Sequence, residues 1–234
     1  MNKILNRNQL KYLAIIAMVI DHIGFFFVDK DSIMYTICRI IGKITAPTMC
    51  YFMIEGYLHT SSKFKYGIRL LIFAVISQFA FSLAFDNTLF IFELNMIFTL
   101  FICFLILLSC DKIKNKFVKL LSIICLIWIT QFCDWGIFAP LWTIVFYKSR
   151  NNLTIMLSLY YVVSSAVLIA RYISYYLSGY IMNNLMNYLG LLLFFPMIYL
   201  YNGEKGKSNK FNRWFFYIFY PLQFLIFFLL KQIV

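Results

Sequence analysis

The chain of 234 residues is 63% hydrophobic and only 13% charged, and it contains 27 phenylalanines and 17 tyrosines. A soluble domain is about half apolar and about a quarter charged, so this composition excludes an ordinary soluble domain and indicates an integral membrane protein. The formal net charge of +12 would suggest a nucleic-acid partner in a soluble protein, but the basic residues gather in particular connecting segments, which argues against nucleic acid.

The apolar residues form continuous runs instead of alternating with polar ones, which predicts helices and not a membrane barrel. We therefore expect an all-α, polytopic bundle of about nine transmembrane helices in a single domain that covers residues 1–234. In chain order the predicted spans are Leu10–Val28, Ile33–Leu58, Gly67–Phe85, Leu94–Cys110, Phe117–Phe132, Gly136–Tyr147, Leu153–Ala170, Asn184–Leu200 and Trp214–Leu230.

Two of these segments depart from the usual pattern. Gly136–Tyr147 is short for a span, so it is expected either to cross only part of the bilayer or to extend through Trp135. Arg171–Asn183 is aromatic and amphipathic, which favours a helix that lies in the membrane interface.

The distribution of lysine and arginine predicts the orientation of the spans, because cytoplasmic loops are enriched in these residues. With a cytoplasmic N-terminus, the outer connections hold mainly acids: Asp29, Asp31, Asp86, Glu93 and Asp134. The inner side then holds most of the 21 basic residues, namely Lys3, Arg7, Lys11, Lys63, Lys65, Arg69, Lys112, Lys114, Lys116, Lys119, Lys148, Arg150, Lys205, Lys207, Lys210 and Arg213. We therefore expect a multi-pass protein of the cell (plasma or inner) membrane.

The cysteines are expected to be small apolar residues that form neither disulfides nor a metal site, because they are scattered through the apolar runs without paired spacing. They are Cys38, Cys50, Cys103, Cys110, Cys125 and Cys133.

Ionisable side chains inside the spans are the strongest functional signal, since each costs about 2.5–3.5 kcal/mol to insert. Asp21 and His22 lie about 9–10 Å below the outer end of the first span, at a rise of about 1.5 Å per residue. Asp21 continues a stripe of small residues, Ala14, Ala17 and Gly24, which predicts that it faces the interior of the bundle. His22 is one of two histidines, and histidine is the side chain suited to proton transfer near neutral pH.

Arg39 lies about 9 Å below the outer end of the second span, at the same depth as Asp21. The equal depths predict an Asp21–Arg39 ion pair, because a partner lowers the cost of both charges in lipid. Pro47 is expected to bend this helix. Four residues of the span are predicted to share one face: Arg39, Lys43, Ala46 and Cys50.

Other polar residues give weaker signals. Glu55 and His59 are one helical turn apart near the inner end of the second span, where they form either part of a site or an interfacial pair. Asp134, with Asp86 and Glu93, is a candidate acidic rim for a cationic substrate. The amides and hydroxyls inside or beside spans, which commonly hydrogen-bond between helices, are Gln78, Asn95, Thr99, Gln131 and Gln223.

The chain resembles the TraX family of membrane proteins, typified by the acetylase of conjugative F-type pilin. The resemblance begins with LKYLAIIAMVIDHIG (Leu10–Gly24) and continues through RIIGKITAPTMCYFMIEGYLHT (Arg39–Thr60), and these two blocks together are the more specific part. Further blocks follow in the family's order and extend the resemblance over nearly the whole chain: Tyr66–Gln78, Asn95–Leu100, Asp134–Gly136 and Phe216–Gln223.

The resemblance implies transfer of an acetyl group from cytoplasmic acetyl-CoA to an amine of a peptide or protein at the membrane. Carried over by motif position, His22 is the candidate general base, with Asp21 beside it and Arg39 and Glu55 in supporting roles. Substrate-binding candidates are Lys43, His59, Asn95, Asp134 and Gln223. Two residues depart from the family pattern, since Lys43 stands where arginine is expected and Gln223 follows the Tyr-Pro pair where histidine is common.

This chemistry suits the residues, because an amine attacks a thioester only after losing a proton, and a neutral histidine accepts one. Arg39, Lys43 or Gln223 would donate to the developing oxyanion. The lysine-rich segments Lys112–Lys119 and Lys205–Arg213 would attract the phosphates of the donor, although the same lysines are explained equally well by the orientation rule.

Other functions remain open at this point. An enzyme of the same class would acetylate a hydroxyl of a sugar or lipid. A transporter would use Asp21, His22 and Arg39 as a proton path, although transporters usually contain internal repeats and this sequence has none. A purely structural interpretation makes Asp21 and Arg39 a packing ion pair and His22 a hydrogen-bonded interior residue, and an assembly protein would tolerate replacement of them all.

Overall fold

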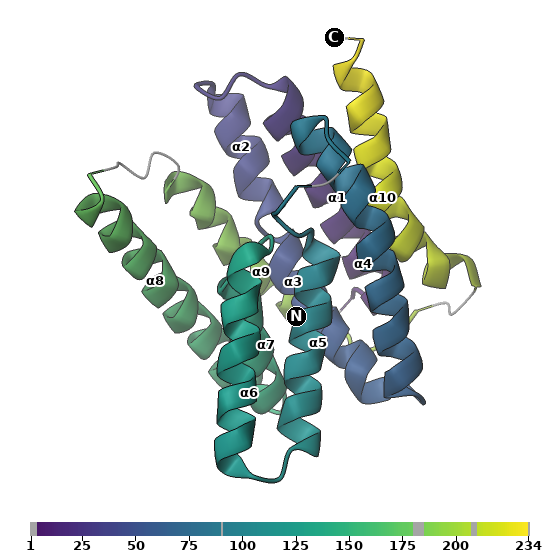
Figure 1. Ribbon diagram of the computed structural model, residues 1–234, viewed down its shortest axis with the longest axis vertical. Coiled ribbons are helices and arrows are strands. Elements are labelled where there is room, and N and C mark those ends of the chain that lie inside the picture. The colour runs from purple at the N-terminus through teal and green to yellow at the C-terminus, as the bar shows by residue number, and fades with distance from the viewer. Residues whose placement is uncertain (1–3, 90, 180–184, 207–209, 234) are drawn as a thin grey trace. The chain divides into compact units, whose positions relative to one another are not determined.

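The computed structural model describes residues 4–89, 91–179, 185–206 and 210–233, and these residues form helices, in agreement with the expected all-α class (Figure 1). Lys3, Lys207 and Asn184, the last of which begins the eighth predicted span, lie outside the described residues. In chain order the helices are α1 (Arg7–Phe27), α2 (Ile33–Gly42), α3 (Thr45–His59), α4 (Lys63–Asp86), α5 (Met96–Lys112), α6 (Lys116–Ile129), η1 (Thr130–Phe132), α7 (Phe138–Ser149), α8 (Leu153–Leu177), η2 (Leu185–Leu193), α9 (Phe194–Tyr199) and α10 (Lys210–Lys231).

Asparagine and serine side chains fix where many of these helices begin. Each accepts a hydrogen bond from a backbone N–H of the first turn, which no carbonyl of the helix itself reaches. Asn6 starts α1: its Oδ1 atom accepts from the Gln9 backbone N–H, and its own backbone N–H donates in return to Gln9 Oε1. The other capping residues are Ser32 for α2, Ser62 for α4, Asn95 for α5, Asn115 for α6 and Asn152 for α8.

The chain divides into two compact units. Unit 1 comprises Met1–Tyr51 and Ile144–Glu204, and unit 2 comprises Phe52–Thr143 and Lys205–Val234. The divisions fall within α3 and within α7. In unit 1, α2 packs against α1 and η2; in unit 2, α4 packs against α5 and α10, and α5 and α6 form a hairpin (Figure 1).

The second predicted span is broken in the structure. α2 ends at Gly42 and α3 begins at Thr45. Between them the backbone hydrogen bonds span three residues instead of four, from Lys43 N to Ile40 O and from Ile44 N to Ile41 O (3.3 and 3.4 Å). Pro47 explains the break, because its ring conflicts with the carbonyl four residues earlier, which belongs to Lys43. The predicted common face of Arg39, Lys43, Ala46 and Cys50 is therefore not the face of one continuous helix.

Two more boundaries differ from the sequence prediction. α8 continues to Leu177, so Arg171–Leu177 extends a long helix instead of starting a separate interfacial one. The last part of that predicted segment, residues 180–183, lies outside the described residues. The eighth predicted span consists, where it is described, of the 3₁₀ helix η2 followed by the short helix α9.

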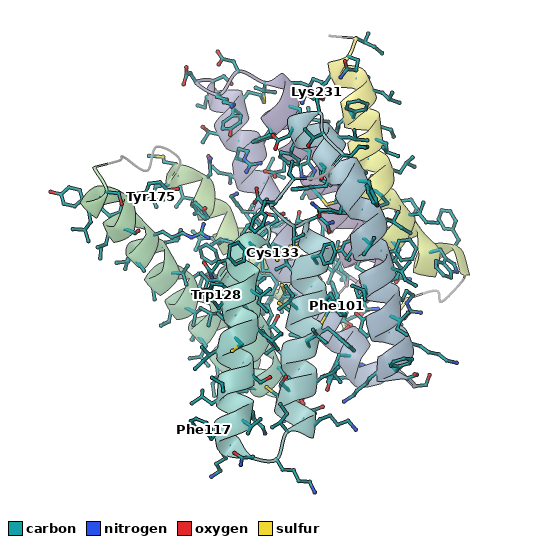
Figure 2. The ribbon with its side chains drawn as sticks, viewed as in Figure 1. Phe101, Phe117, Trp128, Cys133, Tyr175 and Lys231 are labelled. Carbon is teal, nitrogen blue, oxygen red and sulfur yellow. The ribbon has the colours of Figure 1, made fainter. Side chains whose placement is uncertain are left out.

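Five helical segments in the described part of the chain are long and apolar enough to cross a membrane: Arg7–Phe27, Ile33–His59, Lys63–Asp86, Leu153–Leu177 and Trp214–Lys231. Apolar side chains also cover their outer faces, as on α4, where Ile72 and Phe79 are 51% and 53% exposed. α6 buries none of its residues, and Phe117 and Trp128 project from it (Figure 2). Such surfaces require lipid around them, so the chain is a membrane protein.

Candidate functional site

Glycines bring the helices of unit 1 unusually close together. A Cβ atom on Gly24 of α1 would collide with Cys38 of α2, and one on Gly42 of α2 would collide with the Asp21 side chain. Small residues allow two helix backbones to approach in this way. The close approach of α1 and α2 therefore places Asp21 directly against the second helix, as the small-residue stripe predicted.

Asp21 and Arg39 form the ion pair predicted from their equal depths. The Arg39 Nη1 atom lies 2.7 Å from Asp21 Oδ2, and the two side chains are only 19% and 16% exposed. The Arg39 guanidinium also lies 5.4 Å from the centre of the Phe25 ring. Within the described residues, the buried atoms Asp21 Oδ1 and Arg39 Nε make no hydrogen bond. The pair thus keeps one acceptor and one donor uncommitted.

His22 and Lys43 belong to the same charged cluster. Asp21 and His22 each lie within electrostatic range of Arg39 and Lys43. The His22 ring, half-buried on α1, has its centre 6.3 Å from that of Phe26, which lies one helical turn further along α1. The structure therefore brings together four of the predicted site residues: Asp21, His22, Arg39 and Lys43.

Gly190 and Tyr188 of η2 pack against Lys43. A Cβ atom on Gly190 would collide with the Ile40 carbonyl and would come within 2.9 Å of Lys43 Cβ. The Lys43 Nζ atom lies 5.1 Å from the centre of the Tyr188 ring, and Arg171 Nη1 donates to the Tyr188 hydroxyl over 3.5 Å. Tyr188 and Arg171 could not be predicted as part of this cluster, since the break after α2 and the extension of α8 that position them were not predicted.

The remaining predicted site residues belong to unit 2. His59 Nδ1 lies 2.8 Å from the backbone carbonyl of Glu55, so the contact at the end of α3 involves the Glu55 main chain. The Asp134 main chain donates to Leu94 O and accepts from Thr99 Oγ1 (2.8 and 2.7 Å), which holds the turn before α7 against the start of α5.

Asn95 stands at the centre of a hydrogen-bond network in unit 2. Its backbone N–H and its side-chain Nδ2 both donate to Gln78 Oε1 (3.0 and 2.8 Å), and Nδ2 also donates to Ala74 O (2.9 Å). Gln78 Nε2 donates to Glu93 O (2.9 Å). Because Asn95 also caps α5, this network supports the interpretation that Asn95 and Gln78 hold helices together.

Gln223 behaves differently, although it is another buried amide of the same unit. Its side chain is 3% exposed, and neither amide atom has a hydrogen-bond partner in the described part of the chain. An unsatisfied buried amide is costly and calls for an explanation.

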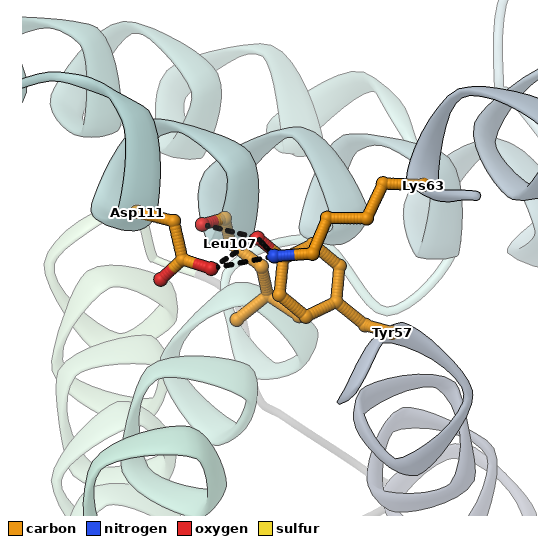
Figure 3. A network of polar contacts seen from close by, with 4 residues as sticks. All are labelled: Tyr57, Lys63, Leu107 and Asp111. Atoms are coloured by element: carbon orange, nitrogen blue, oxygen red, sulfur yellow. Dashed lines mark hydrogen bonds and ion pairs between the residues drawn. The ribbon is translucent and has the colours of Figure 1, made fainter. Parts of the chain in front are cut away.

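A polar group that was not predicted from the sequence joins α3, α4 and α5 in unit 2 (Figure 3). Tyr57 Oη donates to Asp111 Oδ2 (2.6 Å) and lies 3.2 Å from Leu107 O, while Lys63 Nζ donates to both Asp111 Oδ2 and Tyr57 Oη (2.8 Å each). Lys63 was predicted to lie near the inner membrane face, and Asp111 immediately precedes Lys112 of the same predicted face, so pairing opposite charges at that level would have found them.

Comparison with known proteins identifies the family. The family model described as TraX protein matches residues 6–231. The chain belongs to the TraX family. This TraX-family chain is similar to the probable fimbrial assembly protein FimC (serogroup H1) of Dichelobacter nodosus, with 32% identity over 225 residues that cover 92% of this chain and 91% of the relative.

A shorter similarity is found with an uncharacterized protein of Rickettsia prowazekii (strain Madrid E). It is 42% identical over 77 residues, which cover 33% of the TraX-family chain and 27% of that protein. No solved structure matches the chain.

Proposed function

We propose that this protein is a membrane-embedded acetyltransferase that moves an acetyl group from cytoplasmic acetyl-CoA to an amine of a peptide or protein. The observation that supports this most is the incomplete ion pair of unit 1. Asp21 and Arg39 bind each other through one atom each and keep Oδ1 and Nε buried and uncommitted beside His22. Family membership supports the same conclusion, because the sequence resembles the family typified by a pilin acetylase.

The available atoms match the needs of acetyl transfer. The attacking amine presents N–H groups, which Asp21 Oδ1 accepts, and the thioester carbonyl becomes an oxyanion, to which Arg39 Nε–H donates. A donor of this kind in a site from which water is excluded contributes about 2.7–4 kcal/mol to lowering the barrier. The ion pair holds both atoms in place, so that little reorganisation accompanies the reaction.

His22 has the role of general base in this proposal. The amine nitrogen forms a bond with the carbonyl carbon while the imidazole removes its proton, and the carbon–sulfur bond then breaks. The proton passes from the imidazolium to the departing thiolate, so the products are an amide and free CoA. Lys43, which Tyr188 and Gly190 hold beside this cluster, keeps the local potential positive as the oxyanion develops.

The proposal includes a membrane topology of about nine spans with a cytoplasmic N-terminus in the cell membrane. The lysine and arginine distribution supports it. In that orientation His22 and Asp21 lie in the outer half of the bilayer, so the acceptor reaches them from outside. The D. nodosus relative is named for fimbrial assembly, which supports a peptide or protein acceptor over a lipid.

Transfer in reconstituted membranes tests the proposal. Purified protein in liposomes is given acetyl-CoA with an isotopically labelled acetyl group, together with peptides that carry a free N-terminal amine. We expect label in an amide that resists hydroxylamine. A labelled ester that hydroxylamine cleaves would assign the acceptor to hydroxyl groups, and ion or proton flux without acetyl-CoA would favour a transporter.

A further inference from the structure

The Lys63–Asp111 ion pair holds the start of α4 against the end of α5 in unit 2 (Figure 3). Lys63 Nζ lies 2.8 Å from Asp111 Oδ2. Further from these two helix ends, the rings of Tyr66 and Phe104 meet edge to face at 5.4 Å. The residue numbers rise along α4 while they fall along α5, so the two helices run in opposite directions, and the first turn of α4 lies at the level of the last turn of α5.

α6 begins at the same end of unit 2. A hydrogen bond of 3.1 Å between the Ser109 and Ser122 hydroxyls sets the register of the α5–α6 hairpin (Figure 1). Lys112 and Lys119 are each three residues closer to the turn of the hairpin, so both lie about 4.5 Å along the helix axes from that bond. The starts of α4 and α6 and the end of α5 therefore meet at one end of unit 2.

This end of unit 2 carries six lysines, which we call the lysine patch: Lys63, Lys65, Lys112, Lys114, Lys116 and Lys119. The only acid within the two segments that form it, residues 63–65 and 111–119, is Asp111, and Lys63 pairs with it. The other five lysines make no ion pair with any described residue. The lysine patch therefore presents an excess of positive charge to its surroundings.

Two phenylalanines project among these lysines. Phe64, between Lys63 and Lys65, is 76% exposed, and Phe117, directly after Lys116, is 74% exposed (Figure 2). The 24 residues of α4 are about 36 Å long, which exceeds the hydrocarbon layer of about 30 Å, so the first turn of the helix reaches the lipid headgroups. Phe64 therefore lies where acyl chains meet headgroups, with positive charges on both sides of it.

We propose that the lysine patch, together with Phe64 and Phe117, binds anionic phospholipids of the membrane leaflet at this end of unit 2. The lysine ammonium groups donate to the phosphodiester oxygens, and the two exposed rings contact the adjoining parts of the acyl chains. A cluster of four to eight basic residues beside a membrane span is typical of anionic-lipid recognition, and the lysine patch has six.

The bias of basic residues toward the cytoplasm explains the lysines but not the phenylalanines. Lys148 and Arg150, which are predicted to lie on the same side of the membrane, show what that bias produces by itself. They flank Ser149, and Arg150 turns back onto its own chain: Nη1 donates to Tyr147 O (2.7 Å), and the guanidinium lies 4.9 Å from the centre of the Tyr147 ring. No apolar ring projects between these two charges, whereas each segment of the lysine patch has one.

Lipid binding to the purified full-length protein in a nonionic detergent tests the proposal. Dioleoyl-phosphatidylglycerol, which is anionic, and dioleoyl-phosphatidylcholine, which has the same chains and no net charge, are added in increasing amounts. The rise in the thermal unfolding temperature gives the apparent affinity for each lipid. We expect phosphatidylglycerol to bind at least about tenfold more tightly, and this preference to shrink as salt is added, because salt screens the attraction.

The test variant carries Lys114→Gln and Lys116→Gln, and the matched control carries Lys148→Gln and Arg150→Gln. Both pairs are exposed, both are two residues apart, and both are predicted to face the same side. We expect the test variant to bind phosphatidylglycerol about tenfold more weakly than the wild type and to bind phosphatidylcholine equally well. The control remains within twofold of the wild type for both lipids.

Phe64→Ser tests the apolar half of the proposal. We expect it to weaken binding of both lipids by about threefold, because the lost contacts are with acyl chains that the two lipids share. Ile33→Ser is the matched control, since Ile33 is 80% exposed in the first turn of α2 but follows Asp31 and Ser32 instead of a lysine. It leaves both affinities within twofold of the wild type.

Three results would overturn the inference. Equal binding of the two lipids by the wild type, or an equal loss in the test variant and its control, would leave the cytoplasmic bias as the whole explanation of the lysines. Displacement of bound phosphatidylglycerol by inorganic phosphate or CoA at the same concentration would assign the lysines to soluble phosphates. None of these measurements depends on acetyl transfer, so the proposed function stands or falls separately.

Discussion

The two ion pairs that join described residues lie in different units and in different surroundings. Asp21–Arg39 of unit 1 lies within two apolar helices, with side chains that are 16% and 19% exposed. Lys63–Asp111 of unit 2 lies where α4 begins and α5 ends, and is 36% and 27% exposed. Tyr57 completes the second pair by binding both partners.

The two pairs differ in how completely their polar atoms are used. Lys63, Tyr57 and Asp111 all hydrogen-bond to one another, and such a group holds the ends of helices together. Asp21 and Arg39 pair at a much greater desolvation cost and still leave one buried atom each uncommitted. A costly arrangement that leaves atoms uncommitted is better explained by a reactant than by packing.

Breaking the buried pair has the largest expected effect on stability. Arg39→Met leaves Asp21 buried without its partner, and we expect the free energy of unfolding to fall by about 3–5 kcal/mol. Denaturation in detergent measures it. The charge-swapped double variant Asp21→Arg with Arg39→Asp recovers part of the loss, and a swap no better than the single variants would show that the two charges do not stabilise each other.

Gly42→Ala has the next largest effect, because the new Cβ meets the Asp21 side chain and forces α1 and α2 apart. We expect a loss of about 1–3 kcal/mol and a disturbed ion pair. Gly56→Ala is the matched control: its Cβ would lie 2.7 Å from Tyr66 Oη, the outermost atom of a side chain, whereas the Cβ of Gly42→Ala would collide with Asp21 Cβ, at the base of one. Equal thermal shifts for the two variants would show that the α1–α2 approach is not tight.

Replacing Gln78 tests the satisfied network of unit 2 against the unsatisfied amide of the same unit. Gln78→Leu removes the acceptor of Asn95 and strands buried donors, and we expect a loss of about 1–3 kcal/mol. Gln223→Leu removes no hydrogen bond and leaves stability unchanged or slightly higher. Thermal unfolding of both variants checks this, and an equal loss in both would mean that Gln223 has a partner in the folded protein.

Lys63→Met has the smallest effect, at most about 1 kcal/mol, because this pair is partly exposed and sits at helix ends. A loss as large as that of Arg39→Met, measured under the same conditions, would remove the distinction between the two pairs.

The fold class and the centre of unit 1 could be predicted from sequence because they follow from short-range rules. Long apolar runs specify helices, and a fixed rise per residue placed Asp21 and Arg39 at one depth. Pro47 was expected only to bend the second span, and the helix instead breaks at Lys43, because the proline ring conflicts with the carbonyl four residues before it. The continuation of α8 past Arg171 was missed because an aromatic, amphipathic segment suits an interfacial helix equally well.

Contacts between distant segments were harder to predict. Tyr57 and Asp111 are 54 residues apart and Tyr188 and Arg171 are 17 apart, and no periodic pattern links such pairs. That the Gln223 amide has no hydrogen-bond partner among the described residues could not be predicted either, because it depends on which groups the neighbouring helices present.

The most direct test is the rate of labelled acetyl transfer by reconstituted wild-type protein and by His22→Ala, with insertion and folding verified for both. A general base contributes about 10²–10⁴-fold, so we expect the variant to lose at least about a hundredfold in rate while it still binds CoA. Transfer by His22→Ala at the wild-type rate would contradict the proposed role of this histidine.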